Sequence, residues 1–274
     1  MKRSRLVSWL RPLLVPLCVL AAYELVVYLY SAIGGISTKL IVLPPPTQIL
    51  IRLTQSFTDS TVLGATANTL IATLLGFSLG ITGAIAIGTL LGASRWSHAY
   101  LAPTLHFLRS LPVILYLPVA LVLFGSDIRL PVFLSAFVTT LYGAVPVIRA
   151  VRDYDEEKIL FLRARGYTRA QTLIKFVLPE IIAALSTTIS ITVTLALAVT
   201  VAAEMLLPGL GGLGTLLIRA KEFSDYIFLW ALTCLLGICG FLFHGIVQHL
   251  WWFAAPWVKT DAADQEIAYG HQPN

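Results

Sequence analysis

Charged residues are scarce in this sequence. They make up 12% of its 274 residues, about half of the roughly 25% that is usual in a soluble domain. Hydrophobic residues make up 57%, and the mean hydropathy is +0.83. Such an apolar excess must be buried in something other than a protein core, and lipid is the obvious solvent. The composition and the long apolar runs therefore predict an all-α integral membrane protein, because helices satisfy their own backbone groups in lipid.

Sequence motifs of several enzyme and binding-protein classes are also absent. No G-K-[ST] tripeptide is present, so the chain has no phosphate-binding loop for ATP. No serine–histidine or paired-carboxylate arrangement is visible, and we predict no catalytic residues. The net charge of +5 is modest and no arginine-rich arm with interleaved aromatics occurs, which argues against a nucleic-acid partner.

A metal site is not expected either. The three cysteines lie in apolar runs without zinc-type spacing. His244 and His249 are five residues apart with no carboxylate nearby, and we interpret them as histidines at a membrane interface. Gly209, Gly211 and Gly214 match G-x-G-x-x-G, but no strand precedes them, so the match does not predict a dinucleotide site.

Six apolar stretches are candidate membrane spans. They cover residues 13–33, 64–91, 111–125, 130–151, 180–207 and 226–253. A 21-residue helix reaches roughly 31 Å, which is enough to cross a hydrocarbon core. Pro112 and Pro118 interrupt the third span, after an interfacial segment at 99–109. Prolines inside a span either line a pathway or only bend the helix, and both interpretations stay open.

The first two spans carry unusual residues. Glu24 lies near the middle of the first span, where a carboxylate is costly, so that side of the helix is expected to face the bundle. The second span has a ridge of small residues at every fourth position, which predicts a centrally packed helix that its neighbours approach closely. The ridge consists of Gly64, Asn68, Ala72, Gly76, Gly80, Ala84, Gly88 and Gly92.

Lysine and arginine indicate the orientation. With a cytoplasmic N-terminus, thirteen of them fall inside and five outside, with Arg109 left at or in the membrane. The asymmetry predicts cytoplasmic tails at residues 1–12 and 255–274 around a membrane domain at 13–254. The N-terminus superficially resembles a signal peptide, but the long apolar run without a cleavage site predicts a retained first helix.

Residues 153–179 form the longest polar interval between spans, and the predicted orientation puts them in the cytoplasm. Asp153 and Glu156 predict a helix start, and Gly166 predicts a left-handed helix end. Thr168 with Gln171 predicts a second capping box, and Pro179 is expected to close the segment. The first helix has apolar residues at 159–162 rimmed by two arginines, which indicates a docking element. An ordinary loop is the alternative.

Glu204 lies near the outer end of the fifth span, before a glycine-rich turn. Three interpretations are open at this point. The carboxylate reaches interfacial water, borders a translocation path, or sets the end of a helix.

Several motifs in this order resemble the permease subunits of bacterial ATP-binding-cassette importers that depend on a binding protein. They are LPPPTQIL, GASRW, LRSLPVILYLPVALVLFG, RARGYTRAQTLIKFVLP and AEMLLPGLGGLG, within residues 40–255. The nitrate, sulfonate, taurine and bicarbonate permeases are the group most similar to this chain. The resemblance implies a six-span subunit of the inner membrane that pairs with a second permease subunit, the same or homologous. It also implies two cytoplasmic ATPase subunits, which bind ATP and magnesium, and an external solute-binding protein.

The cytoplasmic signature of that family is matched in part. Gly166, Leu178 and Pro179 match its glycine and its Leu-Pro, whereas Leu160, Phe161 and Leu162 stand where the family has Glu-Ala-Ala. The departure puts an acidic ATPase contact in doubt and suggests an asymmetric pair of permeases. The predicted ATPase-coupling residues are Leu160, Phe161, Leu162, Arg163, Arg165, Gly166, Thr168, Leu178 and Pro179.

The resemblance also implies a translocation path between two permease subunits. The residues expected to line or gate it are Arg109, Pro112, Pro118, Glu204 and Met205. Arg109 suits an oxyanion such as a sulfonate, taurine or nitrate, and another small solute such as a vitamin precursor is the alternative. Two other classes remain open: a secondary transporter, for which no matching pair of broken helices is found, and an intramembrane enzyme, for which no catalytic cluster is visible.

Overall fold

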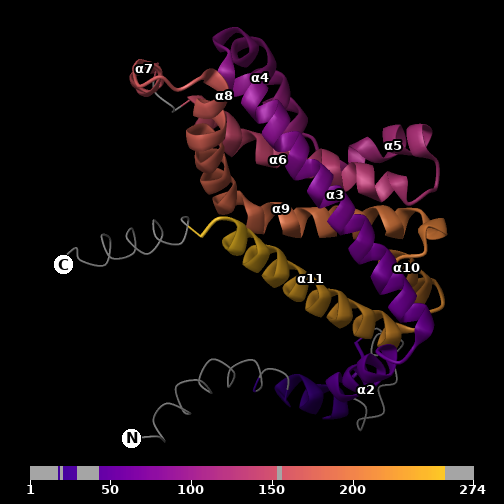
Figure 1. The fold of residues 1–274 in the computed structure, drawn as a ribbon. Coiled ribbons are helices and arrows are strands. Elements are labelled where there is room, and N and C mark those ends of the chain that lie inside the picture. The colour runs from indigo at the N-terminus through magenta and orange to yellow at the C-terminus, as the bar shows by residue number, and fades with distance from the viewer. Residues whose placement is uncertain (1–17, 19–20, 30–42, 153–155, 257–274) are drawn as a thin grey trace, which may run out of the picture.

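A computed structural model describes residues 18, 21–29, 43–152 and 156–256 of the chain. The predicted first span and both predicted tails lie wholly or largely outside these residues. Within them, the regular structure is entirely helical (Figure 1). The all-α prediction is therefore confirmed for the described part of the chain.

The helices follow one another with short connections. Their order is α2 (Pro46–Ser56), α3 (Ser60–Ala93), α4 (Arg95–Ser110), the 3-10 turn η1 (Val113–Tyr116), α5 (Leu117–Phe124), α6 (Arg129–Arg152), α7 (Glu156–Ala164), α8 (Arg169–Thr172), the π-helical turn η2 (Leu173–Val177), α9 (Leu178–Leu206), the 3-10 turn η3 (Pro208–Leu210), α10 (Leu213–Glu222) and α11 (Tyr226–Ala254).

Four of these helices are long and apolar enough to cross a membrane. The stretches are Ser60–Ala93, Arg129–Arg152, Thr188–Leu206 and Tyr226–Phe253. They coincide with the predicted second, fourth, fifth and sixth spans. The second and sixth begin at capping aspartates, because the side chain of Asp59 accepts from the Thr61 amide and that of Asp225 accepts from the Phe228 amide.

The predicted third span, 111–125, is interrupted at Pro112 as expected. Two helical segments, Ala99–Ser110 and Val113–Phe124, meet there at a bend of 103°. Pro112 stands at the break, where its ring fixes the backbone angle and it has no amide hydrogen to continue the helix of α4. The hydroxyl of Tyr116 donates to the Leu108 carbonyl oxygen at 2.8 Å across the break, so the bent pair is held together.

The small-residue ridge of α3 packs against α6. A Cβ atom added at Gly76, Gly80, Gly88 or Gly92 would collide with the side chain of Ser135, Thr139, Val147 or Val151, respectively. These partners are also four residues apart, so the two ridges meet along their length. The hydroxyl of Thr140 also donates to the Gly80 carbonyl oxygen at 3.1 Å. The predicted close approach is confirmed, except at Gly64, which has no atom within 4 Å of an added Cβ.

This register shows that α3 and α6 run parallel. Residue numbers on both helices rise together, from Gly76 beside Ser135 to Gly92 beside Val151. The chain between them, which contains α4, η1 and α5, must therefore return over the length of the contact. The aromatic rings of Tyr116 and Phe137 lie 4.7 Å apart, so the returning segment packs on α6.

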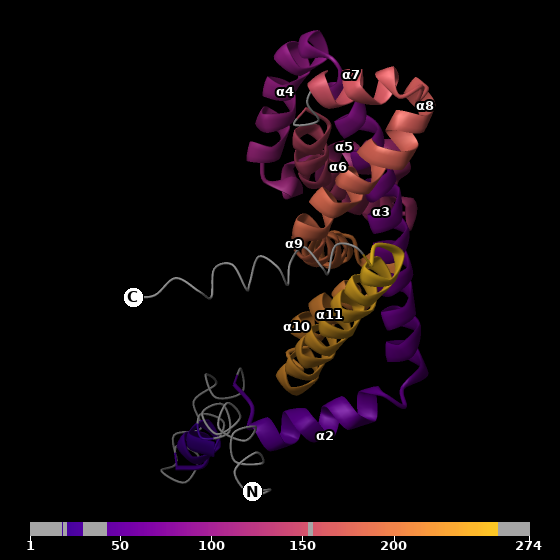
Figure 2. The ribbon, with the colours of Figure 1, turned by 60° about the vertical axis from the view of Figure 1, so that its left-hand side comes forward.

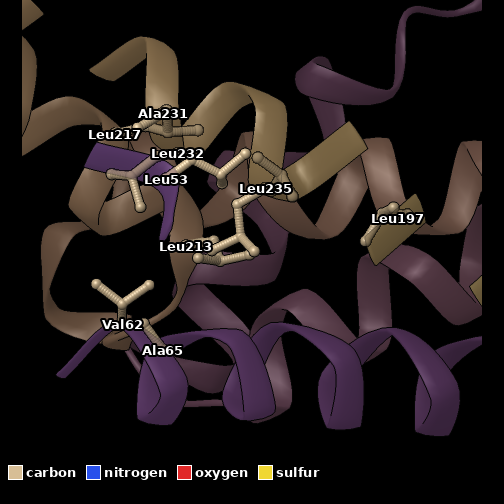
Figure 3. Close-up of a cluster of buried hydrophobic side chains, with 10 residues drawn as sticks. Leu53, Val62, Ala65, Leu197, Leu213, Leu217, Ala231, Leu232 and Leu235 are labelled. Carbon is tan, nitrogen blue, oxygen red and sulfur yellow. The ribbon is translucent and has the colours of Figure 1, made fainter. Parts of the chain in front are cut away.

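Helix α9 packs between α6 and α11. Leu185 joins Val147 and Ala150 of α6 in one buried cluster, and Ala196 joins Phe243 of α11 in another. A third cluster lies at the opposite end of the bundle from α7, where side chains of α2, α3, α10 and α11 meet (Figures 2 and 3). It contains Leu53, Val62, Ala65, Leu197, Val201, Leu213, Leu217, Ala231, Leu232 and Leu235.

The side chain of Glu24 contacts the N-terminus of α2. Its carboxylate accepts from the Thr47 amide at 3.2 Å and from the Thr47 hydroxyl at 2.8 Å. It supplies an acceptor for the first turn of α2, and the expectation that this side of the first span faces the bundle stays a prediction.

Candidate functional site

Gly166 ends α7 in the manner predicted. Its φ angle is +83°, in the left-handed region that favours glycine. The Gly166 amide donates to the Arg163 carbonyl oxygen and the Tyr167 amide donates to the Leu162 carbonyl oxygen. This pair of bonds is a Schellman motif, which closes the helix end. The predicted cap at Asp153 lies outside the described residues.

The next turn begins with the predicted capping box. The Thr168 amide donates to Oε1 of Gln171 at 3.0 Å, and the Gln171 amide donates to the Thr168 hydroxyl at 3.3 Å. Two of the amide donors at the helix start are therefore satisfied by side chains.

Pro179 does not end the second helix, so that prediction is wrong. Leu178 and Pro179 lie in the first turn of α9, and the helix runs from α8 through η2 into α9 without a break. The π turn explains how this is possible, because the Leu178 amide donates to the Leu173 carbonyl oxygen five residues earlier. The register shift accommodates a proline that would otherwise interrupt the α-helical pattern. The helix that begins at α8 is thus continuous with the fifth predicted span.

The apolar residues of α7 divide into an exposed and a buried part. Leu160 is 63% exposed and Phe161 is 57% exposed, whereas Leu162 is only 7% exposed. Leu162 therefore belongs to the protein core and not to an exposed face. The guanidinium of Arg165 lies 4.5 Å from the Phe161 ring centroid. We call Leu160 and Phe161 the α7 patch. Arg163 is also exposed, and the side chain of Ile159 lies outside those that the structure describes.

Glu204 is buried in a hydrogen-bonded cluster between α9, α3 and α10. Only 2% of it is exposed. Its Oε1 and Oε2 atoms lie 3.0 and 2.9 Å from the Thr69 hydroxyl, and Oε2 accepts from the Gly214 amide at 3.0 Å. The same hydroxyl accepts from the Leu213 amide at 2.8 Å. Glu204 therefore does not reach interfacial water, and it holds the N-terminus of α10, where a carboxylate is favoured.

The glycine-rich turn is shaped by this carboxylate. A Cβ atom at Gly212 would collide with the carboxylate of Glu204, and one at Gly214 would collide with the Val201 carbonyl oxygen. Gly211 has a φ of +69°, and its carbonyl oxygen accepts from the Asn68 side chain at 3.2 Å. Close packing against α9 and α3 accounts for these glycines, and no strand precedes them in the described chain.

Arg109 is at the end of α4, beside the bend. Its guanidinium lies 4.6 Å from the ring centroid of Tyr142 on α6. Its Nε atom is buried without a hydrogen-bond partner among the described residues. Tyr142 is near the middle of α6, about 20 Å from Arg129 and about 15 Å from Arg152 along the helix axis.

The structure does not bring all the predicted path residues together. Pro112 and Pro118 are exposed in the bent pair and Met205 is 38% exposed at the end of α9. By the α3–α6 register, Tyr142 lies about 21 Å along α3 from Thr69, the partner of Glu204. Arg109 and Glu204 thus occupy different depths of the bundle. A role in translocation remains a prediction for all five residues.

An ion pair lies where α6 begins. Nε of Arg129 lies 2.7 Å from the Asp127 carboxylate. This hydrogen bond holds the pKa of Asp127 below its ordinary value. The ion pair therefore stabilises the ionised form of Asp127.

Sequence reasoning missed two residues of these sites, Thr69 and Tyr142. Thr69 follows the ridge residue Asn68, but its partners Glu204 and Leu213 are more than 130 positions away. Tyr142 had no distinguishing local pattern. Among the described residues, no group of three or more histidine, cysteine, aspartate or glutamate side chains could hold a metal ion.

Comparison with known families supports a membrane transport component. Residues 80–250, more than half of the chain, match the model of the family described as the binding-protein-dependent transport system inner membrane component. The matched region begins within α3 and ends within α11, so it contains most of the α3–α6 contact, the helices α7 and α8, and Glu204.

Individual relatives agree with this family. The chain is 25% identical over 250 residues to the putative aliphatic sulfonates transport permease protein SsuC of Bacillus subtilis, covering 89% of this chain and 86% of the relative. It is 27% identical over 220 residues to the taurine transport system permease protein TauC of Escherichia coli, covering 78% of this chain and 80% of the relative. It is also 27% identical over 221 residues to a probable ABC transporter permease protein of Brucella melitensis, covering 81% and 87%.

A solved structure shares the fold. A chain of the MetNI methionine ABC transporter in an inward-facing conformation superposes with a TM-score of 0.56 at 21% sequence identity. The match covers 69% of this chain and 95% of that chain.

Proposed function

This chain belongs to the family of binding-protein-dependent transport system inner membrane components, and on that premise we propose that it is the membrane-spanning subunit of an ATP-driven importer. It is a multi-pass protein of the inner membrane, with four helices long and apolar enough to cross it in the described residues. The proposal adds the number of crossings, the coupling to an ATPase and the class of solute.

We propose six crossings with both termini in the cytoplasm, and the fold and the charge distribution support this number and orientation. Two parallel crossings, α3 and α6, need an odd number of crossings between them, which supports the bent pair α4–α5 as a return crossing. With α9 and α11 this makes five, and residues 13–33 supply the sixth. The excess of lysine and arginine on one side sets the orientation.

The α7 patch is the observation that carries the coupling proposal. Leu160 and Phe161 are more than half exposed at the end of the bundle that the charge count places in the cytoplasm. Since Gly166 closes α7 and the next helix continues into α9, a partner that moves α7 would move α9 with it. We assign this patch, with Arg163, Arg165 and the Gly166–Thr168 turn, to the contact with an ATPase subunit.

The proposed assembly contains two ATPase subunits, a second permease subunit and an external solute-binding protein. ATP and magnesium would bind on the ATPases, and this chain would hydrolyse nothing itself. Solute would cross between the two permease subunits by alternating access, past Arg109, Pro112, Pro118, Glu204 and Met205. Closing of the ATPases would drive the change through α7 and α9.

The proposed solute is a small oxyanion. Two relatives are named for aliphatic sulfonates and for taurine, and a third for bicarbonate. Arg109, at mid-depth in the bundle, suits the same chemistry. Another small solute such as a vitamin precursor is the alternative, because selection of the solute depends largely on the binding protein.

Purification from native membranes tests the proposal. The tagged chain should bring down a separate ATPase, a permease subunit and a binding protein, each identified by mass. Solute uptake that proceeds without ATP or any ATPase would instead indicate a secondary transporter. Activity on lipid or peptide would indicate an intramembrane enzyme.

A further inference from the structure

We propose that Arg109, held against the ring of Tyr142, forms a binding site for a small oxyanion within the membrane, in which Tyr142 is the positioning residue. The biological meaning of this site rests on the proposed import of an oxyanion. The binding itself is a property of this chain and is tested without the ATPase.

The guanidinium of Arg109 lies deep in the helix bundle. Tyr142 lies about 20 Å from Arg129 and about 15 Å from Arg152 along α6, so the guanidinium lies near the middle of a crossing helix. An arginine side chain remains charged in proteins. Ionisable residues at this depth are costly and mark functional sites when they face protein or a path.

In the described part of the chain, no carboxylate lies within ion-pair distance of Arg109, and the ion pair found there joins Arg129 with Asp127. The Nε atom of Arg109 is buried and has no hydrogen-bond partner among the described residues. Burial of a cation without a partner is costly, and an anionic acceptor beside the guanidinium would lower that cost.

The face of the Tyr142 ring lies 4.6 Å from the guanidinium carbon, which is a cation–π contact. An arginine stacked on a ring keeps its N–H donors along the edge of its plane. That edge matches two oxygens of a sulfonate, nitrate or carboxylate group.

The position of Arg109 beside the bend lets an anion reach the guanidinium and leave it. Arg109 is half-buried, and its neighbours Phe107, Ser110 and Pro112 are exposed. A single guanidinium without further ligands binds an anion weakly, which suits a site that a solute must also leave.

A small oxyanion fits better than a lipid phosphate. Phosphate headgroups lie at the membrane surface, about 15 Å from the centre of the hydrocarbon core. An arginine near the middle of α6 does not reach them without a strong local deformation of the bilayer. The distance therefore favours a ligand that enters the bundle.

The test uses the full chain in nanodiscs of phosphatidylcholine, with methanesulfonate as the probe and uncharged dimethyl sulfone as its matched control. Methanesulfonate should raise the midpoint of thermal unfolding in a saturable manner, and dimethyl sulfone should not.

Variants test the two residues of the site. Arg109→Gln should weaken the apparent affinity for methanesulfonate at least tenfold, and Arg109→Lys should weaken it by a smaller factor. Tyr142→Phe keeps the ring and should bind as the parent does, whereas Tyr142→Leu should weaken binding several-fold. Arg129→Gln, at an exposed arginine, should change nothing.

Three results would overturn the site. They are equal shifts with the sulfonate and the sulfone, a sulfonate shift that survives in Arg109→Gln, and a shift abolished by adding phosphatidylglycerol, which would assign Arg109 to lipid phosphate. If sulfonate binding depends on Arg109 but no ATPase accompanies the chain from native membranes, the proposed function fails and the site stands.

Discussion

The carboxylate of Glu204 on α9 and the hydroxyl of Thr69 on α3 lie 2.9 and 3.0 Å apart at their two closest atom pairs, in a cluster that excludes solvent. The same two side chains receive the amides of Gly214 and Leu213 at the start of α10. Three helices that are distant in sequence are thereby fixed at one point. The first turn of α10 is held at this point by hydrogen bonds, and Leu213 and Leu217 pack the helix into the neighbouring apolar cluster.

We expect Glu204→Ala to destabilise the protein. The substitution leaves the Gly214 amide without its acceptor in a buried site, at a cost of about 1–3 kcal/mol, while the Thr69 hydroxyl keeps the Ala65 carbonyl oxygen as an acceptor. The midpoint of thermal unfolding in detergent should fall by several degrees. Glu204→Gln retains one acceptor oxygen, so its midpoint should fall by less than that of Glu204→Ala. The matched control is Glu222→Ala, an exposed carboxylate on α10 itself, and equal midpoints for both alanine variants would contradict the capping role.

Substituting alanine for a glycine of α3 should change the thermal stability according to whether that glycine contacts α6. Alanine at Gly80 must displace Thr139 or the Ala136 carbonyl oxygen, which would lie 2.7 Å from the new Cβ atom. Overpacking of this kind costs about 1–3 kcal/mol, so Gly80→Ala should lower the thermal midpoint. Gly64→Ala, on the same helix but in open space, should gain up to about 1 kcal/mol from helix propensity. The same change in midpoint for both variants would argue against the α3–α6 contact.

Gly166→Ala should impair coupling without unfolding the bundle. No atom lies within 4 Å of an added Cβ atom, so the change acts only through the positive φ, where an L-residue costs about 1–2 kcal/mol. The closure of α7 should weaken, and the affinity of purified ATPase for the chain in nanodiscs should fall several-fold. Gly166→Asn should show a smaller effect, since asparagine tolerates this region. An affinity unchanged in both variants would remove Gly166 from the coupling segment.

Acidic residues in the α7 patch should abolish the partner contact. Leu160→Asp combined with Phe161→Asp places two carboxylates in a surface proposed to be buried by the ATPase, where an unpaired charge is costly. Co-purification of the ATPase should fall at least tenfold while the thermal midpoint stays the same, because both side chains are exposed. The control is Phe223→Asp, which alters a side chain that is 81% exposed near the opposite end of the bundle. Retention of the ATPase by the double variant would make docking at α7 wrong.

Local sequence signals were sufficient for much of the fold. Continuous apolar runs place α3, α6, α9 and α11 to within a few residues, since lipid requires long unbroken helices. The stop at Gly166 and the Thr168–Gln171 box were also predictable, because each depends on side chains within three residues of the helix end.

Other features depend on contacts between distant residues. The bend at Pro112 could have been a kink or a complete break, and packing of Tyr116 on α6 decides between them. Pro179 was expected to stop a helix, but a π turn accommodates it. The role of Glu204 required Thr69, 135 positions away, and no pattern along the chain joins the two.

Photo-crosslinking at position 161 tests the central claim most directly. The chain would carry benzoylphenylalanine in place of Phe161 and be irradiated in native membranes, with position 223 as the control site. The account predicts that position 161 forms an adduct with a separate ATPase, identified by mass, and that position 223 does not. An adduct at position 161 with this chain alone, or none with any ATPase, would contradict it.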